Sequence, residues 1–467
     1  MRRVTTDGIG KRILWSARLA VRAPLEARFP FHSPRAIGRA QRRRIEATVV
    51  HAHEHVPYYR ETMRKLALGP GDIRTEADLA RLPLIEREQV QRDPEYFVSR
   101  AHPLDSYLNL RSGGSTAEPV TVFRHPLSLF EGAAINERLR SLIVRLAGRR
   151  LRFSELLIVL PDSPGGSRDA FDSRSLLPSS LRVARDRLSI LTPPSEAAAA
   201  LDELRPDVLA TYGSYLEALF AHLEATGARV ALPKVAAFSS DGLSDAARRL
   251  ITGLGVHVLG AYRAIEAPWV GFECERHRGY HLNVDLSPVR IVDRDGDDVA
   301  EGEGGEVVSS DLTSVGGTIL LNYRLGDIAA RLPDRCECGR NLPLISYIEG
   351  RSAEWLVGPA GELIHGQALR DLMRRRQDVL RYQVVQRAPD RLTVTLAATS
   401  GSDAGELRAW IARRFAERLG EGVRTEVVFS EDLPRTARGK TLRVISELES
   451  TARARVQGGA TSGAEQR

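Results

Sequence analysis

Apolar and polar positions follow different rhythms along the chain. In the first hundred residues, apolar residues recur at helical spacing, which predicts helices over Pro34–His55 and over residues 58–68. From about residue 120 to 260, short apolar runs alternate with longer helical segments. The runs lie at residues 156–160, 208–211 and 235–238, and the helical segments at 195–204 and 215–226. This alternation is typical of a sheet covered by helices, so we predict an α/β fold.

Short strands separated by turns dominate after Gly260 and predict a β-rich subdomain. They lie at residues 289–292, 305–310 and 318–323. Beyond residue 351 a small α/β unit is expected. Its strands are predicted at residues 382–386, 392–396 and 424–429, with an amphipathic helix at 404–419. The tail, rich in Ala, Gly, Ser and Arg, is expected to be disordered.

The composition is that of a globular protein, because 42% of the 467 residues are hydrophobic and 27% are charged. The net charge of +7 comes mainly from arginine spread among 60 acidic residues. Nucleic-acid binding usually needs a concentrated basic stripe, so we expect no nucleic-acid partner and infer only a field that attracts anionic substrates. Three cysteines are too few for a disulfide framework, which indicates a reducing, cytoplasmic location.

Basic residues interrupt every apolar stretch near the N-terminus. They are Arg2, Arg3, Lys11, Arg12, Arg18 and Arg22. The segment therefore matches neither a signal sequence nor a transmembrane helix. Two alternatives remain for it: a basic amphipathic helix that rests on a membrane surface, or a solvated helix packed on the body of the protein.

A loop of small and hydroxylated residues precedes a predicted strand at residues 120–123. It reads Ser112-Gly113-Gly114-Ser115-Thr116-Ala117-Glu118-Pro119. Glycines let backbone N–H groups approach phosphate oxygens, and the hydroxyls can donate hydrogen bonds to a polyphosphate. The loop lacks the Gly-Lys-Ser/Thr ending of a Walker A motif, and small-residue loops are usually only connections.

Lys440 and Asp327 are two further candidate functional residues. Lysine is rare in a chain that otherwise uses arginine, and Lys440 follows Gly439 in a turn. A chance surface lysine is the alternative. Asp327 stands in a glycine turn, where its carboxylate could accept hydrogen bonds from both hydroxyls of a ribose, although aspartates in turns are usually local caps.

In order and spacing these motifs resemble the adenylate-forming superfamily, and within it phenylacetate-CoA ligase and its capsule-polysaccharide-associated relatives. The resemblance extends from residue 56 to 444, and its most specific pieces are residues 112–119, 323–327, 336–340, 348–351 and 434–440. It implies a large N-terminal domain of helix-covered sheets with a β subdomain, and a small mobile C-terminal α/β domain. The expected parts are a helical region at residues 1–100, a core that binds ATP and the acid at 101–350, a hinge at 351–354, a lid domain at 355–449 and the tail at 450–467.

The resemblance also implies roles for individual residues. Those expected to bind ATP are Ser112, Gly113, Gly114, Ser115 and Thr116 at the phosphates, Ser239, Ser240, Asp241 and Tyr262 at adenine, and Asp327 and Arg351 at the ribose. Glu266 would hold Mg²⁺, Glu354 would lie in the hinge, and Lys440 would contact the carboxylate and the α-phosphate. Attack of a carboxylate on a phosphate brings two anions together, so a lysine and magnesium would offset the charge.

Several positions depart from the family pattern. Ala117-Glu118 replaces Gly-Lys, Ile265 replaces a hydroxyl residue, and residues 357–361 replace a Gly-x-Asn-x-Phe-Pro stretch of CoA ligases in this branch. The last change leaves the acyl acceptor open: CoA is the default, and a carrier-protein thiol or an amine is the alternative. The other changes motivate a different alternative, a catalytically degenerate scaffold, although the presence of Glu266, Asp327, Arg351 and Lys440 together argues against it.

All three cysteines belong to a predicted zinc site. Cys274-x-x-His277-x-x-x-His281 and Cys336-x-Cys338 supply thiolate and imidazole ligands in two clusters, which suits a closed structural site. Either histidine could be the fourth ligand, and the resemblance favours His281. Three buried thiols beside two surface histidines are the alternative.

The resemblance implies a small carboxylic acid as substrate. Its pocket is expected near residues 212–215, Phe238 and residues 261–268, whose aromatic side chains would suit an aryl or medium apolar acid. The expected cofactors are ATP, Mg²⁺ and structural Zn²⁺, with CoA or an acyl-carrier protein as partner. A homodimer would be in keeping with such enzymes.

Overall fold

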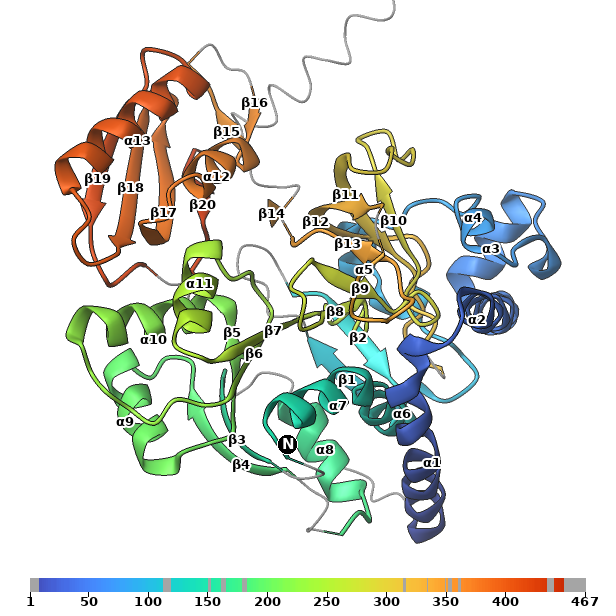
Figure 1. The fold of residues 1–467 in the computed structure, drawn as a ribbon. Coiled ribbons are helices and arrows are strands. Elements are labelled where there is room, and N and C mark those ends of the chain that lie inside the picture. The colour runs from blue at the N-terminus through green and yellow to red at the C-terminus, as the bar shows by residue number, and fades with distance from the viewer. Residues whose placement is uncertain are drawn as a thin grey trace, which may run out of the picture.

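One large sheet joins a parallel half to an antiparallel half, and a smaller sheet lies near the C-terminus (Figure 1). The computed structural model describes residues 8–111, 119–149, 153–160, 165–178, 183–313, 316–333, 335–348, 350–351, 355–359, 363–434 and 441–448. In the large sheet the strand order is β10-β11-β12-β13-β9-β8-β7-β6-β5-β3-β4, with β14 paired to β12. The predicted α/β fold is thereby confirmed.

The parallel half is built from strands that follow one another through helices. Its strands are β3 (Ser154–Val159), β4 (Ala184–Ser189), β5 (Val208–Tyr212), β6 (Val235–Ser239) and β7 (His257–Tyr262). The connecting helices include α8 (Gly165–Arg174), α9 (Pro194–Leu204), α10 (Gly213–Thr226) and α11 (Asp245–Gly253). The central strands β5 and β6 are almost continuously apolar, as expected for parallel strands covered on both faces.

The antiparallel half continues the same sheet beyond β7. Its strands are β8 (Gly271–Glu273), β9 (Tyr280–Leu282), β10 (Val289–Val292), β11 (Gly304–Ser309), β12 (Tyr323–Leu332), β13 (Leu344–Ile345) and β14 (Gly350–Arg351). The strand predicted at residues 318–323 was wrong, because β12 begins only at Tyr323. The backbone before it bonds to several segments instead of one neighbour: Ile319 donates to Phe97, and Leu320 accepts from Asp311.

Helices and a hairpin of the N-terminal region flank this sheet. They are α1 (Ile9–Arg28), α2 (Pro34–His55), α3 (Pro57–Lys65), α4 (Glu76–Leu79), α5 (Arg87–Arg92), β1 (Leu108–Arg111), β2 (Thr121–Arg124), α6 (Leu127–Ile135) and α7 (Glu137–Leu146). The helix predicted over Pro34–His55 is present with those bounds. Ser33 caps it, Pro34 occupies its first turn, and Pro57 prevents its continuation.

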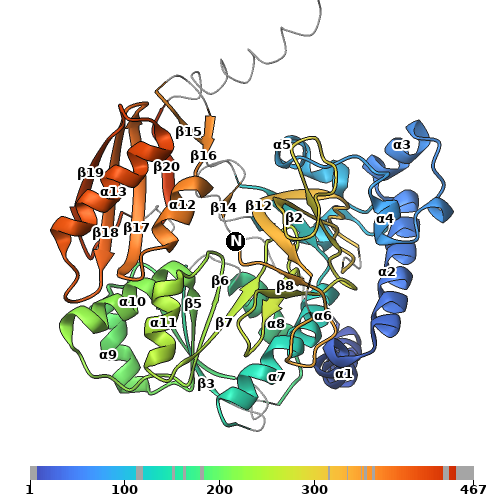
Figure 2. The same cartoon turned by 45° about the horizontal axis from the view of Figure 1, so that its top comes forward.

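The C-terminal unit has its own sheet and core. It contains β15 (Trp355–Val357), β16 (Leu363–His365), α12 (Gln367–Arg374), β17 (Val379–Ala388), β18 (Arg391–Ala398), α13 (Ala404–Leu419), β19 (Arg424–Phe429) and β20 (Val444–Ser446). Four of these strands pair in the order β19-β18-β17-β20, with α13 packed on β19 (Figure 2). The Asp403 side chain caps α13 by accepting hydrogen bonds from two backbone amides. Strong local periodicity and this cap explain why the helix was predicted with its observed bounds.

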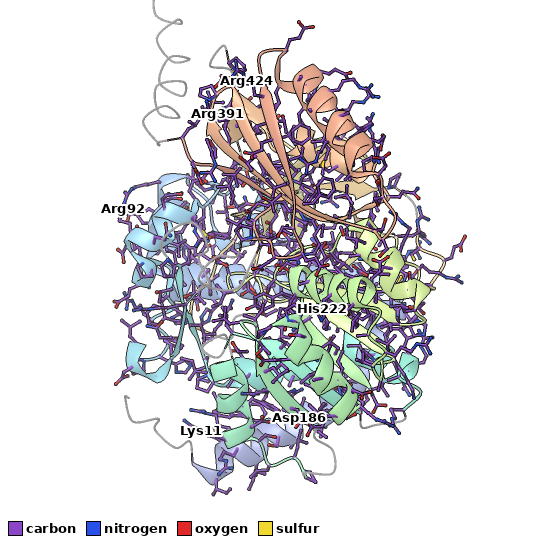
Figure 3. All side chains as sticks on the ribbon, turned by 90° about the vertical axis from the view of Figure 1, so that its left-hand side faces the viewer. Lys11, Arg92, Asp186, His222, Arg391 and Arg424 are labelled. Atoms are coloured by element: carbon purple, nitrogen blue, oxygen red, sulfur yellow. The ribbon has the colours of Figure 1, made fainter. Side chains whose placement is uncertain are left out.

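Most charged side chains lie on the outside, as Figure 3 shows for Lys11, Arg92 and Arg424. Arg138 of α7 is an exception, with 1% of its side chain exposed. It donates to both oxygens of the fully buried Asp285 at 2.7 and 2.9 Å. It also donates to Glu26 of α1 at 2.6 and 2.9 Å, so one guanidinium ties α1 to the large domain.

Among the described residues, no helix combines the length and the apolar character that crossing a bilayer requires.

We expect Arg138→Ala to destabilise the large domain by about 3 kcal/mol, because the buried Asp285 and Glu26 would lose their shared buried cation and keep only the more exposed Arg44 and Arg22 as partners. The measurement is urea unfolding followed by circular dichroism. Arg140→Ala is the matched control in the same helix, since Arg140 pairs with Glu137 at 3.0 Å nearer the surface and should cost only about 0–1 kcal/mol. Equal losses in the two variants would contradict the central role of Arg138.

Candidate functional site

The small-residue loop connects the two strands of a hairpin. Strands β1 and β2 pair antiparallel, and their last described pair places Arg111 opposite Thr121. Residues 112–118 lie outside the described part of the chain, so the structure fixes only where the loop leaves and re-enters. The predicted phosphate ligands Ser112, Gly113, Gly114, Ser115 and Thr116 are in that gap, and Glu354 and Lys440 also lie outside the described residues.

Two predicted nucleotide ligands meet although they are 65 positions apart in the sequence. Tyr262 is the last residue of β7, and its hydroxyl donates to Oδ2 of Asp327 at 2.9 Å. Asp327 lies in β12 after Gly326, whose φ of 74° favours glycine. Strand β14 pairs with β12 so that Asp327 stands opposite Arg351, whose backbone is therefore near the same point.

Glu266 lies in the connection between β7 and β8, and only 6% of the residue is exposed. Its Oε1 accepts hydrogen bonds from the Tyr323 hydroxyl and from Arg87, each at 3.3 Å. Burial, and then the neighbouring carboxylate of Glu266, raise the pKa of Tyr323 well above its usual value. The tyrosine therefore stays a neutral donor. Both of these hydrogen bonds go to Oε1.

Ser239 ends β6, and Ser240 and Asp241 begin the turn after it, next to the end of β7. The two strands pair in parallel, so this turn and Tyr262 share one edge of the sheet. Ser240 has a φ of 76°, an unusual value for a residue with a side chain. The Asp241 carboxylate accepts from the Ser214 hydroxyl at 2.6 Å and from the Ser214 amide at 3.1 Å, which fixes the turn against the start of α10. In parallel sheets, ligands usually bind at this carboxyl edge.

Arg124 is a residue of this region that sequence reasoning missed. It ends β2, directly after the small-residue loop, and forms a buried ion pair with Asp311 at 2.5 Å. The same guanidinium donates to the backbone oxygens of Ile265 at 3.0 Å and Glu266 at 3.3 Å. It thereby links the loop hairpin to the segment that carries Glu266. An arginine at a buried position of a strand was the available signal, because charged residues are rarely buried without a partner.

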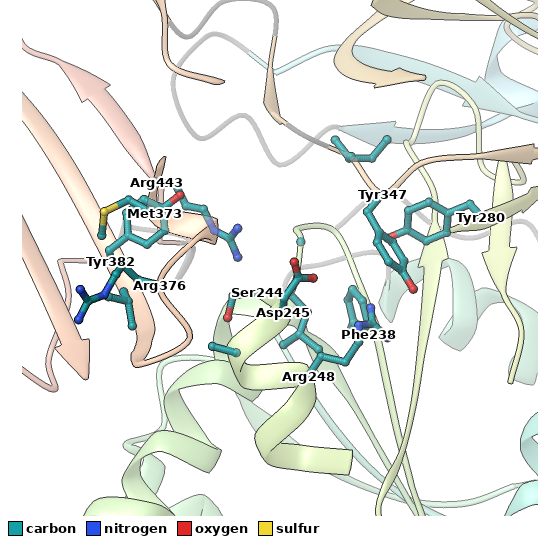
Figure 4. A pocket seen from close by; sticks show the side chains of 15 residues that line it. Phe238, Ser244, Asp245, Arg248, Tyr280, Tyr347, Met373, Arg376, Tyr382 and Arg443 are labelled. Carbon is teal, nitrogen blue, oxygen red and sulfur yellow. The ribbon is translucent and has the colours of Figure 1, made fainter. Parts of the chain in front are cut away.

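The large domain and the C-terminal unit meet across a pocket that Figure 4 shows in close-up. Its lining includes Phe238, Arg248, Tyr347, Arg376, Tyr382 and Arg443. Arg443, shortly after the position of Lys440, pairs with the buried Glu217 of α10 at 2.8 Å. Ser244 donates from its hydroxyl to the Leu380 carbonyl at 2.9 Å. Of the expected acid-pocket residues, Phe238 lines this pocket.

The three cysteines and one histidine form a compact cluster near the end of β8 that lies away from Tyr262. Ligand atoms of Cys274, His281, Cys336 and Cys338 all lie within 4.8 Å of one another. The two sulfurs of Cys274 and Cys336 are 3.6 Å apart, and Cys338 Sγ is 3.3 Å from His281 Nε2. His281 Nδ1 lies 3.3 Å from the Leu342 carbonyl. A hydrogen bond at the ring nitrogen that does not bind the metal orients an imidazole towards the metal.

His277, the alternative fourth ligand, does not join the cluster. Its φ of 52° turns the chain away, and Nδ1 lies 3.5 Å from Glu273 and 3.4 Å from Arg248. The structure therefore brings His281, and not His277, together with the cysteines.

The cysteine thiols influence one another. The hydrogen bond between Cys274 and Cys338, together with that from His281, lowers the pKa of Cys338, although burial opposes the shift. The same bond and burial raise the pKa of Cys274. A divalent cation would instead favour the thiolate form of all three residues, and sulfur with imidazole nitrogen suits zinc.

If zinc occupies this cluster, purified protein should contain about one zinc ion per chain. Cys336→Ser and His281→Ala should lose it, because each removes one of four ligands. Metal content by mass spectrometry is the measurement. His277→Ala is the matched control and should retain the metal. Zinc loss in His277→Ala with retention in His281→Ala would refute this ligand set.

Comparison with known proteins places the chain among carboxylate ligases. The family model described as the CapK C-terminal domain matches residues 356–447. The phenylacetate-coenzyme A ligase of Thermus thermophilus is 25% identical over 405 residues, covering 84% of this chain and 85% of the relative. The enzyme of the same name from Escherichia coli is 26% identical over 337 residues, covering 68% of this chain and 71% of the relative.

A solved structure shows the same fold. The crystal structure of 2-hydroxyisobutyryl-CoA ligase in the postadenylation state, in complex with R3-HIB-AMP, matches with a TM-score of 0.69 and 18% identity. The match covers 93% of this chain and 94% of that protein. The chain is thus similar over most of its length to phenylacetate-coenzyme A ligases, matches the CapK C-terminal domain near its end, and has the fold of an adenylate-forming CoA ligase.

Proposed function

We propose that the protein uses ATP and magnesium to activate a small carboxylic acid as its acyl-adenylate and then transfers the acyl group, by default to CoA. The observation that carries this proposal is the hydrogen bond between Tyr262 and Asp327 at the carboxyl edge of the parallel strands. Glu266 follows in the connection after β7, and Arg124 ties its backbone to the hairpin of the small-residue loop. The relatives named phenylacetate-CoA ligase support it.

In this proposal ATP lies along the carboxyl edge. The turn at Ser239, Ser240 and Asp241 flanks the adenine, and the Tyr262 ring packs against it. Asp327 accepts hydrogen bonds from the ribose hydroxyls, and its bond with Tyr262 aims the carboxylate. Arg351, whose backbone lies opposite Asp327, binds near the ribose and α-phosphate.

The remaining residues bind the phosphates of ATP and offset their negative charge. The backbone and hydroxyls of residues 112–116 bind the β- and γ-phosphates, and Glu266 holds magnesium, which would offset the phosphate charge when bound. Lys440 contacts both the substrate carboxylate and the α-phosphate. The carboxylate oxygen then bonds to the α-phosphorus as the bond to the bridging oxygen breaks, and pyrophosphate leaves.

The second half-reaction needs a different surface. A thiolate sulfur attacks the acyl carbon, the bond to the AMP oxygen breaks, and AMP leaves. We assign residues 351–354 to the hinge and 355–449 to a lid that rotates between the steps. In the orientation described here, the Arg443–Glu217 ion pair and the Ser244–Leu380 hydrogen bond hold the lid against α10 and α11.

The acceptor is the less constrained part of the proposal. Val357 stands at the start of the stretch that departs from CoA ligases, and Gln386 holds its backbone from both sides, at 3.0 Å to the amide and 2.7 Å to the carbonyl. Val357 ends β15 and Gln386 belongs to β17, so the lid itself holds the backbone of β15 in place. A carrier-protein thiol or an amine remains the alternative acceptor.

Adenylation predicts ATP–pyrophosphate exchange that depends on one class of carboxylic acid. Across a panel of aryl and aliphatic acids, we expect exchange with one class and a loss of about 10²-fold or more in Lys440→Ala, because the transition state would lack its cation. Lys65→Ala is the matched control, since the Lys65 side chain is 68% exposed and pairs with nearby Glu61 on the surface. The readout is incorporation of labelled pyrophosphate into ATP.

Two results would count against adenylation. Exchange that survives in Lys440→Ala would remove that residue from the reaction. Absence of exchange with every acid, together with absence of a magnesium-dependent thermal shift by ATP, would favour the degenerate scaffold.

For the acceptor, we expect CoA to accelerate AMP release from enzyme-bound acyl-adenylate and to yield the acyl thioester. Single-turnover assays with the acid identified by exchange measure both products. Hydroxylamine serves as a control, because it traps the adenylate without any acceptor site. Trapping by hydroxylamine with no acceleration by CoA would instead support a carrier protein or an amine.

A further inference from the structure

Helix α1 presents an apolar stripe to solvent on the side opposite to its packing face. Its buried residues Trp15, Leu19 and Glu26 face α6 and α7, where Trp15 packs on Phe130 with ring centroids 5.5 Å apart. At about 100° per residue, positions spaced by four drift slowly around a helix. Ile9, Ile13, Ala17, Val21 and Leu25 therefore form one continuous stripe on the outer side.

These side chains are more exposed than is usual for their type. Of the thirteen large apolar side chains exposed among the described residues, six lie in α1 and the turn after it: Ile9 (61%), Ile13 (55%), Leu14 (65%), Val21 (68%), Leu25 (60%) and Phe31 (50%). Single exposed apolar residues need no explanation, whereas a gathered patch marks a contact surface.

The exposed charged residues of α1 itself are all basic. Lys11, Arg18 and Arg28 are exposed on α1, whereas Glu26, the one acidic residue of that helix, is buried against Arg138. Helix α2, which follows at the same edge of the molecule in Figures 1 and 2, exposes further arginines. They are Arg35, Arg39, Arg42 and Arg43. Figure 3 labels Lys11 near the lower margin of the molecule.

Helix α1 is also held rigidly on the body. Glu26 is bonded to Arg138 inside the protein, and Arg18 and Arg22 both pair with the buried Glu131 of α6. The apolar stripe is therefore a preformed surface, and exposing it does not require the helix to detach.

We propose that α1 docks this protein onto an anionic phospholipid surface. The apolar stripe would enter the boundary between headgroups and acyl chains, and the basic residues beside it would lie among lipid phosphates. This combination of apolar insertion and positive charge is what reversible binding at an interface requires. The proposal does not depend on the reaction, because no residue of the stripe belongs to the proposed ATP or acid site.

The test is co-sedimentation of the full chain with vesicles of phosphatidylcholine and phosphatidylglycerol, compared with phosphatidylcholine alone. We expect binding to the anionic vesicles at least about tenfold tighter, weakened by added salt through screening. The double variant Ile13→Asp, Val21→Asp should lose at least about tenfold of that binding, because it places charge in the stripe. Both positions are exposed, so circular dichroism and thermal midpoint should match the wild type.

The control is Leu204→Asp, Leu254→Asp, which changes two exposed leucines at the ends of α9 and α11, 38% and 47% exposed. It should bind vesicles like the wild type. Equal binding by both double variants, or no binding by the wild type, would overturn the proposal. A wild-type dimer in light scattering that the stripe variant dissociates, without vesicle binding, would also overturn it and assign the stripe to a second copy of the chain.

Discussion

The change from parallel to antiparallel pairing at β7 is the constraint on which the rest of this architecture depends. On one side β7 pairs in parallel with β6, and on the other its last residues pair antiparallel with β8, Ala261 opposite Phe272 and Tyr262 opposite Gly271. Gly271 is required there, because a Cβ would lie 2.8 Å from the His281 carbonyl oxygen. The reversal makes the chain leave β7 through the short segment that carries Glu266 and return immediately.

Because of this reversal, the short strands β8 and β9 lie between two sites, the proposed ATP site and the cysteine cluster. At one end, the carboxyl edge gathers the turn after β6, Tyr262 and Glu266, and β12 brings Asp327 to the same place. At the other end, β8 and β9 deliver Cys274 and His281 to the cysteine pair between β12 and β13. A closed cluster with four protein ligands has no open position for substrate, so its physical role would be to hold the ends of β8, β9 and the following loop together.

Arginine explains both the basic composition and much of the internal order. Arg138, Arg124 and Arg248 lie inside or at the edge of the large domain, each held by a carboxylate: Asp285, Asp311 and Glu273 respectively. A planar guanidinium has five donors in a fixed fork, so it can bind a carboxylate through two parallel hydrogen bonds and still donate to other segments, a geometry that the compact ammonium of lysine does not offer. Part of the positive charge therefore lies in internal ion pairs. The basic residues Lys11 and Arg28 of α1 and Arg35 and Arg39 of α2 are instead exposed at the surface.

Local sequence determined the elements whose stability is local. The periodic helix over Ala404–Leu419 and the strand over Arg424–Phe429 were predicted with their observed bounds, and so was α2, which a cap and a proline delimit. The segment at 318–323 was wrongly predicted because its backbone partners come from distant parts of the chain, which no local pattern encodes.

For the site, the sequence by itself determined which residue types were available: a small-residue loop, an isolated lysine, the Asp327 turn and three cysteines with two histidines. Only the tertiary structure decided which of them meet. The Tyr262–Asp327 bond and the choice of His281 over His277 both depend on strand register, because His281 pairs with Leu344 of β13 while His277 sits in the preceding turn. Register is set by side chains packed across the whole sheet, so it appears only when the chain has folded.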